Sequence, residues 1–129
     1  MSWKLSARSV SRLVGVDPRL KEVALRALEL STIDFGIPKY GGFRSAQEQR
    51  ALFDDNKSKC DGSIKLSYHQ SGNAMDFYAY VNGRASWDEG HLTTVAAALL
   101  QAASELGHKV QWGGHWKGWK DMPHLQLMT

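Results

Sequence analysis

The sequence predicts an α+β domain in which helices pack against a small, mostly antiparallel sheet. Three observations support this fold class. Apolar residues recur at helical spacing near the N-terminus and again over residues 92–106. Short segments with alternating or aromatic residues lie between and after these helices, and turn signals or polar loops separate them. Helices that come first and then separate short strands are typical of α+β domains.

Two helices are expected in the N-terminal region. Ser6 is a suitable N-cap for a short helix that ends near Leu13. Asp17 followed by Pro18 gives an N-cap and then proline at the first helical position. The apolar face of this second helix consists of Leu20, Val23, Ala24, Ala27 and Leu28.

Two further helices follow. Ser45 and Glu48 have the spacing of a capping box, which predicts a helix through about Asp54. The long apolar stripe over residues 92–106 predicts an amphipathic helix, and Gly107 is expected at its C-terminal end.

The strands are expected in four segments. Residues 33–43 look extended, with a turn at residues 40–42, and residues 73–81 alternate as one continuous strand. The dipeptide Asn82-Gly83 then predicts a turn. Residues 109–112 and 123–128 are expected to form two more strands, whereas residues 55–66 and 113–120 form loops.

Size and composition limit the possible functions. The 129 residues suffice for one hydrophobic core, so residues 1–129 are expected to form a single domain. A hydrophobic content of 43% excludes a disordered chain, and no apolar run is long enough for membrane insertion. The net charge of +3 is scattered and no nucleic-acid motif is present, so we expect no nucleic-acid partner. Cys60 is the only cysteine, which excludes an internal disulfide.

Candidate metal ligands lie in two separated segments. His69 and Asp76 flank a turn of small residues, and His124 follows near the C-terminus with Asp121 three residues before it. Two imidazoles and one carboxylate, with a second carboxylate nearby, suit a hydrolytic zinc site that keeps an open position for water. Structural roles for a lone histidine and a hydrogen-bonded aspartate remain the alternative, and the helical His-Glu-x-x-His pattern is absent.

These segments resemble a known family. The pattern Ser67-x-His69-x-x-Gly72-x-Ala74-x-Asp76, with Asp121-x-x-His124 downstream and Gly42-Phe43-Arg44-Ser45-x-x-x-Gln49 upstream, resembles the D-Ala-D-Ala carboxypeptidase/VanY group of zinc peptidases. Within that group the chain is most similar to phage endolysins that are L-alanyl-D-glutamate peptidases. The similarity runs over nearly the whole chain. It implies a fold like that of the hedgehog and DD-peptidase domains.

The resemblance also implies roles for individual residues. It implies zinc ligation by His69, Asp76 and His124, with Asp121 as general base. Arg44 would polarise the scissile carbonyl and stabilise the oxyanion, a role that suits a fixed guanidinium. Two further candidates, Ser67 and Gln49, either contact the substrate or hold the ligand loop and Arg44 in place.

The implied reaction is hydrolysis of the L-Ala–D-Glu bond of bacterial peptidoglycan by a zinc-bound water. One alternative is a D-Ala-D-Ala carboxypeptidase of the same group, and another is a zinc-containing module that binds the wall without catalysis. We expect a monomer without a separate wall-binding domain. Because the N-terminus lacks the pattern of a secretory signal, we expect synthesis in the host cytoplasm and action in a Gram-negative periplasm after membrane permeabilisation.

The aromatic residues before Asp121 leave two interpretations open. Trp112, Trp116 and Trp119 either form a wall of the substrate cleft, where they could also bind sugar rings, or pack in the core and loops. His115, between them, is expected at the surface.

Overall fold

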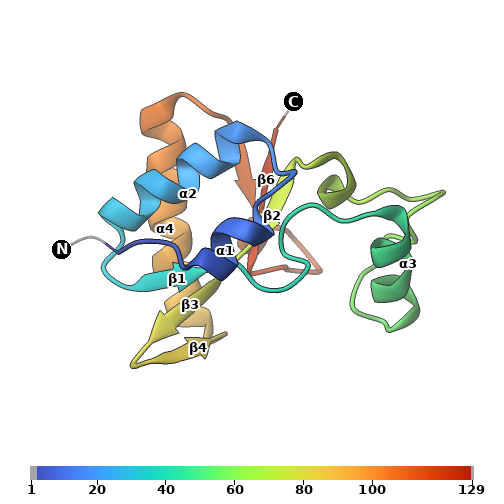
Figure 1. Cartoon of the computed structure of the whole chain (residues 1–129), viewed down its shortest axis with the longest axis horizontal. Coiled ribbons are helices and arrows are strands. Elements are labelled where there is room, and N and C mark those ends of the chain that lie inside the picture. The colour runs from blue at the N-terminus through green and yellow to red at the C-terminus, as the bar shows by residue number, and fades with distance from the viewer. Residues whose placement is uncertain (1–2, 129) are drawn as a thin grey trace.

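A computed structural model describes residues 3–128. The helices are α1 (Ala7–Arg12), α2 (Pro18–Leu30), α3 (Ala46–Asp54) and α4 (Glu89–Leu106), with short 3-10 turns η1 (Tyr68–Ser71) and η2 (Gly113–His115). The strands are β1 (Asp34–Gly36), β2 (Ala74–Asp76), β3 (Tyr78–Val81), β4 (Arg84–Ser86), β5 (Val110–Trp112) and β6 (His124–Leu127). Figure 1 shows their arrangement. The predicted α+β class is confirmed.

The helix ends form as the capping patterns predict. The Ser6 hydroxyl accepts a hydrogen bond from the backbone of α1, and the Asp17 carboxylate accepts one from the first turn of α2. Ser45 and Glu48 form a reciprocal capping box at α3, with distances of 3.1 and 2.9 Å. Gly107 ends α4 in the left-handed conformation, with φ at 77°. Local polar contacts therefore determine where each helix starts or stops.

The expectation of one continuous strand over residues 73–81 is wrong. The strand breaks at Phe77, whose backbone N–H donates to the carbonyl of Pro123 at 2.8 Å. Before the break, β2 pairs with β6; after it, β3 pairs with β1 and β4. The result is two antiparallel sheets of three strands each, in the orders β1-β3-β4 and β2-β6-β5. Side-chain alternation continues through Phe77, so the sequence pattern does not reveal the change of partner.

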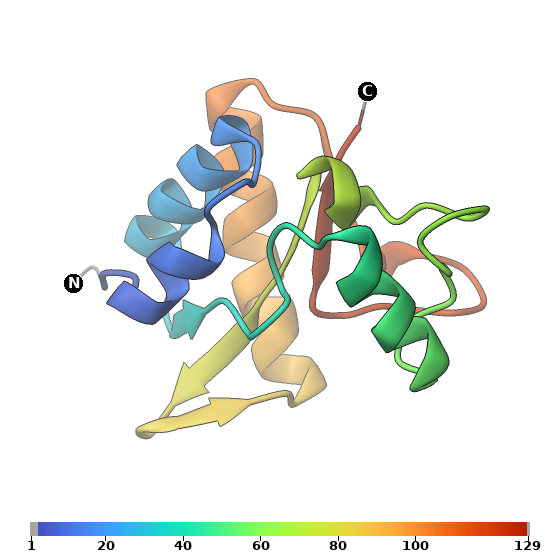
Figure 2. The ribbon, with the colours of Figure 1, turned by 45° about the vertical axis from the view of Figure 1, so that its right-hand side comes forward.

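Helices α2 and α4 pack side by side and supply much of the hydrophobic core (Figure 1). Helix α3 lies on the opposite side of β2 and β6 from this pair, as both ribbon views show (Figure 2). The chain after α3 and the chain before β6 lie together on that same side. No helix among residues 3–128 is both long and apolar enough to cross a membrane.

Candidate metal centre

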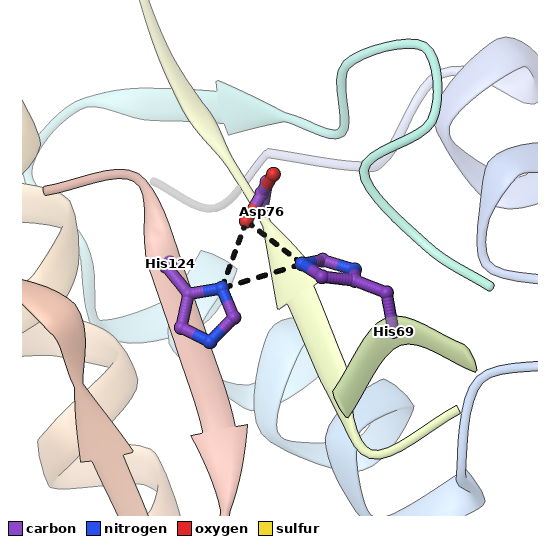
Figure 3. A group of neighbouring side chains, drawn as sticks. All are labelled: His69, Asp76 and His124. Atoms are coloured by element: carbon purple, nitrogen blue, oxygen red, sulfur yellow. Dashed lines mark hydrogen bonds and ion pairs between the residues drawn. The ribbon is translucent and has the colours of Figure 1, made fainter. Parts of the chain in front are cut away.

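Three side chains from separate elements converge beside β2 and β6 (Figure 3). Asp76 and His124 are direct cross-strand partners in the antiparallel β2–β6 pair. His69 comes from η1 and reaches them because Gly72 turns the chain into β2 with φ at 77°. A Cβ atom at Gly72 would lie 2.4 Å from the carbonyl oxygen of Gly15, so glycine is required at this turn.

The three ligand atoms form a nearly regular triangle. His124 Nδ1 lies 3.2 Å from Asp76 Oδ1, and His69 Nε2 lies 3.3 Å from both Asp76 Oδ1 and His124 Nδ1. Neighbouring ligands of a tetrahedral zinc ion with bonds of about 2.0–2.1 Å lie about 3.3 Å apart. The triangle therefore fits one face of a tetrahedral metal site.

Hydrogen bonds on the far sides of the rings assign the protons. His69 Nδ1 lies 2.9 Å from the carbonyl oxygen of Gly42, which can only accept, so this nitrogen carries a proton. His124 Nε2 donates in the same way to Gln126 Oε1 at 2.8 Å. In the neutral rings, His69 Nε2 and His124 Nδ1 are therefore lone-pair acceptors. Two such nitrogens and a carboxylate oxygen at this spacing repel one another unless a cation binds between them.

The ligand carboxylate is also held by a guanidinium. The two carboxylate oxygens of Asp76 contact different groups. Oδ1 faces the two histidines, whereas Oδ2 lies 3.1 Å from Arg44 Nη2. Burial raises the pKa of Asp76, but the imidazoles of His69 and His124 outweigh it, and the net pKa lies well below its usual value. Asp76 is therefore ionised throughout the neutral pH range, as a metal ligand would need to be.

Asp121 lies beside the triangle rather than within it. Its Oδ2 atom is 3.8 Å from His124 Nδ1. A tight turn fixes this position, since the His124 N–H donates to the Asp121 carbonyl at 3.1 Å. Burial and the nearby Asp76 charge raise the pKa of Asp121, a shift opposed by His124, His69 and Arg44. A carboxylate with a raised pKa next to a metal position is suited to accept and return a proton.

Arg44 is fixed by contacts on three of its nitrogens. Besides its contact with Asp76, its Nε donates to the carbonyl of Tyr40 at 2.7 Å and its Nη1 donates to Gln49 Oε1 at 3.1 Å. Gln49 is 0% exposed, and its Nε2 donates to Ser58 Oγ and to the carbonyl of Cys60, both at 2.8 Å. Gln49 thus lies beneath Arg44 and is absent from the residues that line the cleft.

Ser67 occupies a different position from Gln49. Its hydroxyl accepts a hydrogen bond from the His69 N–H at 3.2 Å and caps η1, so it supports the loop that carries this ligand. Ser67 also lines the cleft, where a substrate could reach it.

Three successive carbonyls support the site, and the sequence did not predict their role. The carbonyls of Tyr40, Gly41 and Gly42 accept hydrogen bonds from Arg44 Nε, from the Asp76 N–H at 2.7 Å, and from His69 Nδ1, respectively. Tyr40 has a positive φ of 63°, which is uncommon for a residue other than glycine. The only trace of this role in the sequence is the Gly41-Gly42 pair, which predicts no more than a turn.

A cleft of about 680 Å³ opens over these residues. Its lining includes the three candidate ligands, Arg44, Asp121, three tryptophans and four lysines: Trp87, Trp116, Trp119, Lys39, Lys57, Lys59 and Lys65. Trp116 packs against the His124 ring at 5.2 Å and against Trp119 at 6.4 Å. The sequence indicated two of these tryptophans but singled out neither Trp87 nor the lysines.

Trp112 packs in the hydrophobic core and so follows the second of the two interpretations given for the tryptophans before Asp121. It is 6% exposed, belongs to the hydrophobic core and donates from Nε1 to the carbonyl of Met122 at 2.6 Å. His115 is exposed, as expected, and contacts the edge of the Trp112 ring at 4.9 Å.

Comparison with known proteins gives consistent matches. Residues 1–126 match the sequence family described as phage L-alanyl-D-glutamate peptidase. The chain is 37% identical over 117 residues to the L-alanyl-D-glutamate peptidase of Escherichia phage T5, covering 90% of this chain and 83% of that protein. It is 34% identical over 98 residues to the peptidoglycan L-alanyl-D-glutamate endopeptidase CwlK of Bacillus subtilis, covering 67% of this chain and 58% of that protein.

Solved structures give the same result for the fold. The L-Ala D-Glu endopeptidase ChiX of Serratia marcescens superposes with a TM-score of 0.84 at 36% identity, over 97% of this chain and 90% of that one. An L,D-carboxypeptidase, DacB, from Streptococcus pneumonia shares the fold at 19% identity, with a TM-score of 0.50 over 91% of this chain and 68% of that one.

Proposed function

This chain belongs to the phage L-alanyl-D-glutamate peptidase family, and we propose that it is a zinc peptidase that cleaves the L-Ala–D-Glu bond of peptidoglycan stem peptides. The observation that carries the zinc assignment is the triangle of acceptors formed by His69, Asp76 and His124. Both imidazoles already use their other nitrogen as a donor, so their remaining lone pairs suit a metal ion.

When bound, zinc would supply a Lewis acid that acidifies a water molecule and polarises the peptide carbonyl. The protein's own residues perform the remaining steps. Asp121, beside the triangle, accepts the proton of the attacking water. It then transfers that proton to the nitrogen of the D-Glu residue as the peptide bond breaks. Its Oδ2 atom lies 3.8 Å from His124 Nδ1, which keeps it close to the candidate ligands without joining the ligand set.

Arg44 stabilises the negative charge that develops on the carbonyl oxygen. A guanidinium has five N–H donors, and the described contacts of Arg44 with Tyr40, Gln49 and Asp76 use three of them. The remaining donors can face the substrate from a position that three hydrogen bonds hold in advance. Such preorganisation is what makes oxyanion stabilisation effective. We assign Gln49 to positioning Arg44, and Ser67 to supporting His69 at the edge of the cleft.

Mass analysis of digested peptidoglycan tests the reaction. Purified protein should be stripped with a chelator, reloaded with zinc and incubated with isolated wall material. We expect fragments with D-Glu at a new amino terminus, formed only after zinc is returned. Release of free D-Ala would instead support the carboxypeptidase alternative. Wall binding without new amino termini would support a non-catalytic module.

The expected state of assembly needs its own measurement. We propose that the protein acts as a monomer and as a single catalytic domain. Light scattering at assay concentrations tests the monomer. We also propose that the protein reaches the periplasmic face of the wall after the host membrane is permeabilised. Adding the protein to intact cells and to cells with permeabilised membranes tests the route, since lysis is expected only in the second case.

A further inference from the structure

Lysines gather around the cleft that contains the candidate metal centre. Lys39, Lys57, Lys59 and Lys65 line it, whereas its acidic lining residues are Asp76 and Asp121. Asp76 is already engaged by Arg44 and the two histidines. The cleft therefore presents an excess of positive charge to an incoming ligand, which favours a substrate that carries carboxylates.

Lys59 contacts a distant segment of the cleft lining, whereas the comparable cation–π contact of Lys39 is with its chain neighbour Tyr40. The Lys59 Nζ lies 5.2 Å from the centre of the Trp119 ring, within range of a cation–π contact. Trp119 belongs to the segment that leads into Asp121 and also lines the cleft. This contact involves no hydrogen-bond acceptor atom, so N–H donors of the ammonium group can still bind a ligand. Lys57, in the same loop, lies 3.3 Å from the Asp55 carboxylate, which partly compensates its charge.

Hydrogen bonds through Gln49 connect the loop around Lys59 to Arg44. The residues on either side, Ser58 and Cys60, both accept hydrogen bonds from Gln49 Nε2. The other end of the same amide accepts from Arg44 Nη1. One buried side chain therefore fixes the loop that carries Lys59 relative to the group that faces the scissile carbonyl. Preorganisation of this kind lowers the entropy lost when a ligand binds.

We propose that Lys59 is a specificity-determining residue that binds a carboxylate of the stem peptide on the D-Glu side of the scissile bond. The inference rests on the proposed function and names a substrate feature that the metal ligands do not select. D-Glu continues the stem peptide through its side chain, so its α-carboxyl group remains free or amidated next to the cleaved bond. A charged lysine at the edge of the cleft distinguishes these two forms, because only the free acid forms an ion pair with it.

Paired substrates test this inference directly. Two stem-peptide fragments should differ only in whether the D-Glu α-carboxyl and the C-terminal carboxyl are both free or both amidated. We expect Lys59→Gln to raise KM for the free-acid fragment by roughly two- to fivefold, the upper part of the range of an exposed ion pair. KM for the amidated fragment should change by less than about twofold, since it offers no charge to lose. Singly amidated fragments then identify which carboxylate makes the contact.

Two further variants serve as controls. Lys59→Arg keeps the positive charge and should restore the preference for the free acid. Lys117→Gln removes one charge from an exposed position outside the cleft lining and should leave both KM values unchanged. The proposal is overturned if Lys59→Gln alters both fragments equally or neither of them. Failure of the zinc-loaded wild-type protein to cleave any fragment would instead refute the proposed function itself, and this inference with it.

Discussion

Replacing Gln49 with leucine should separate the positioning of Arg44 from the binding of zinc. The buried Gln49 side chain makes three hydrogen bonds, to Arg44 Nη1, Ser58 Oγ and the carbonyl of Cys60. Leucine has a similar volume but satisfies none of these groups. A bond to a charged partner contributes about 1.5–3 kcal/mol and each neutral bond about 0.5–1.5 kcal/mol. We therefore expect the free energy of unfolding to fall by about 2.5–6 kcal/mol.

The effect on catalysis should appear in kcat. Without Gln49, Arg44 keeps its contacts with Tyr40 and Asp76 but loses one of the three that fix the guanidinium. Loss of oxyanion stabilisation costs about 10²–10³ in kcat when a donor is removed, so a loosened donor should cost about tenfold or more. Bound zinc, measured by elemental analysis, should stay near one per chain, because His69, Asp76 and His124 are unchanged.

A matched variant and three measurements complete this experiment. Gln47→Leu makes the same substitution at an exposed position of α3 and should leave thermal stability, zinc content and kcat near wild-type values. Thermal unfolding, zinc content and kinetics should be measured on both variants. Wild-type kcat in Gln49→Leu would refute the positioning role, as would a loss of zinc as complete as that of His69→Ala.

Three other perturbations test the rest of the site. Asp121→Asn should retain zinc while kcat falls by about 10²–10⁴, the usual contribution of a general base; loss of zinc would show that Asp121 is a ligand instead. Gly42→Ala should lower the melting temperature strongly, because its Cβ would lie 1.9 Å from a backbone carbonyl oxygen. Gly83→Ala meets no atom within 4 Å and should cost only the strain of a left-handed residue at φ 76°, about 1–2 kcal/mol. Zinc affinity, measured by competition with a chelator, should fall as pH decreases. Burial lowers the pKa of His124, but hydrogen bonding to Asp76 and the Asp76 charge outweigh it, so the pKa is raised overall in the metal-free protein. A proton on His124 then competes with the metal. A zinc affinity that does not change with pH would contradict this ligand set.

The helix boundaries were predictable because short-range contacts determine them. Each cap depends on a side chain within three residues of the groups it satisfies, as at Ser6, Asp17 and Ser45. The break at Phe77 was not predictable in this way. It depends on a hydrogen bond to Pro123, far along the chain, and the alternation of side chains is the same on both sides of it. The short strand β4 was missed too, although the Asn82-Gly83 turn before it was predicted.

The candidate site shows a similar contrast between features that the sequence reveals and features that it does not. Side chains with distinctive chemistry, such as His69, Asp76 and His124, could be selected from the sequence. Some of the groups that orient them are backbone carbonyls, such as that of Gly42 beside His69, and any residue type supplies a carbonyl. The contacts from Gly41 and Gly42 to the ligands therefore leave only an indirect trace, the need for glycine where a Cβ would collide.

Strand register links the candidate metal centre to the hydrophobic core. In the β2–β6 pair, Met75 lies opposite Leu125, and both are 0% exposed in the core. The next pair is Asp76 opposite His124, on the other face of the sheet and toward the cleft. A shift of one residue in this register would expose an apolar side chain and turn one ligand away from the other. Burial of Met75 and Leu125 therefore selects the one alignment in which two candidate ligands from distant parts of the sequence meet. The free energy that stabilises the core thus also assembles the candidate metal centre.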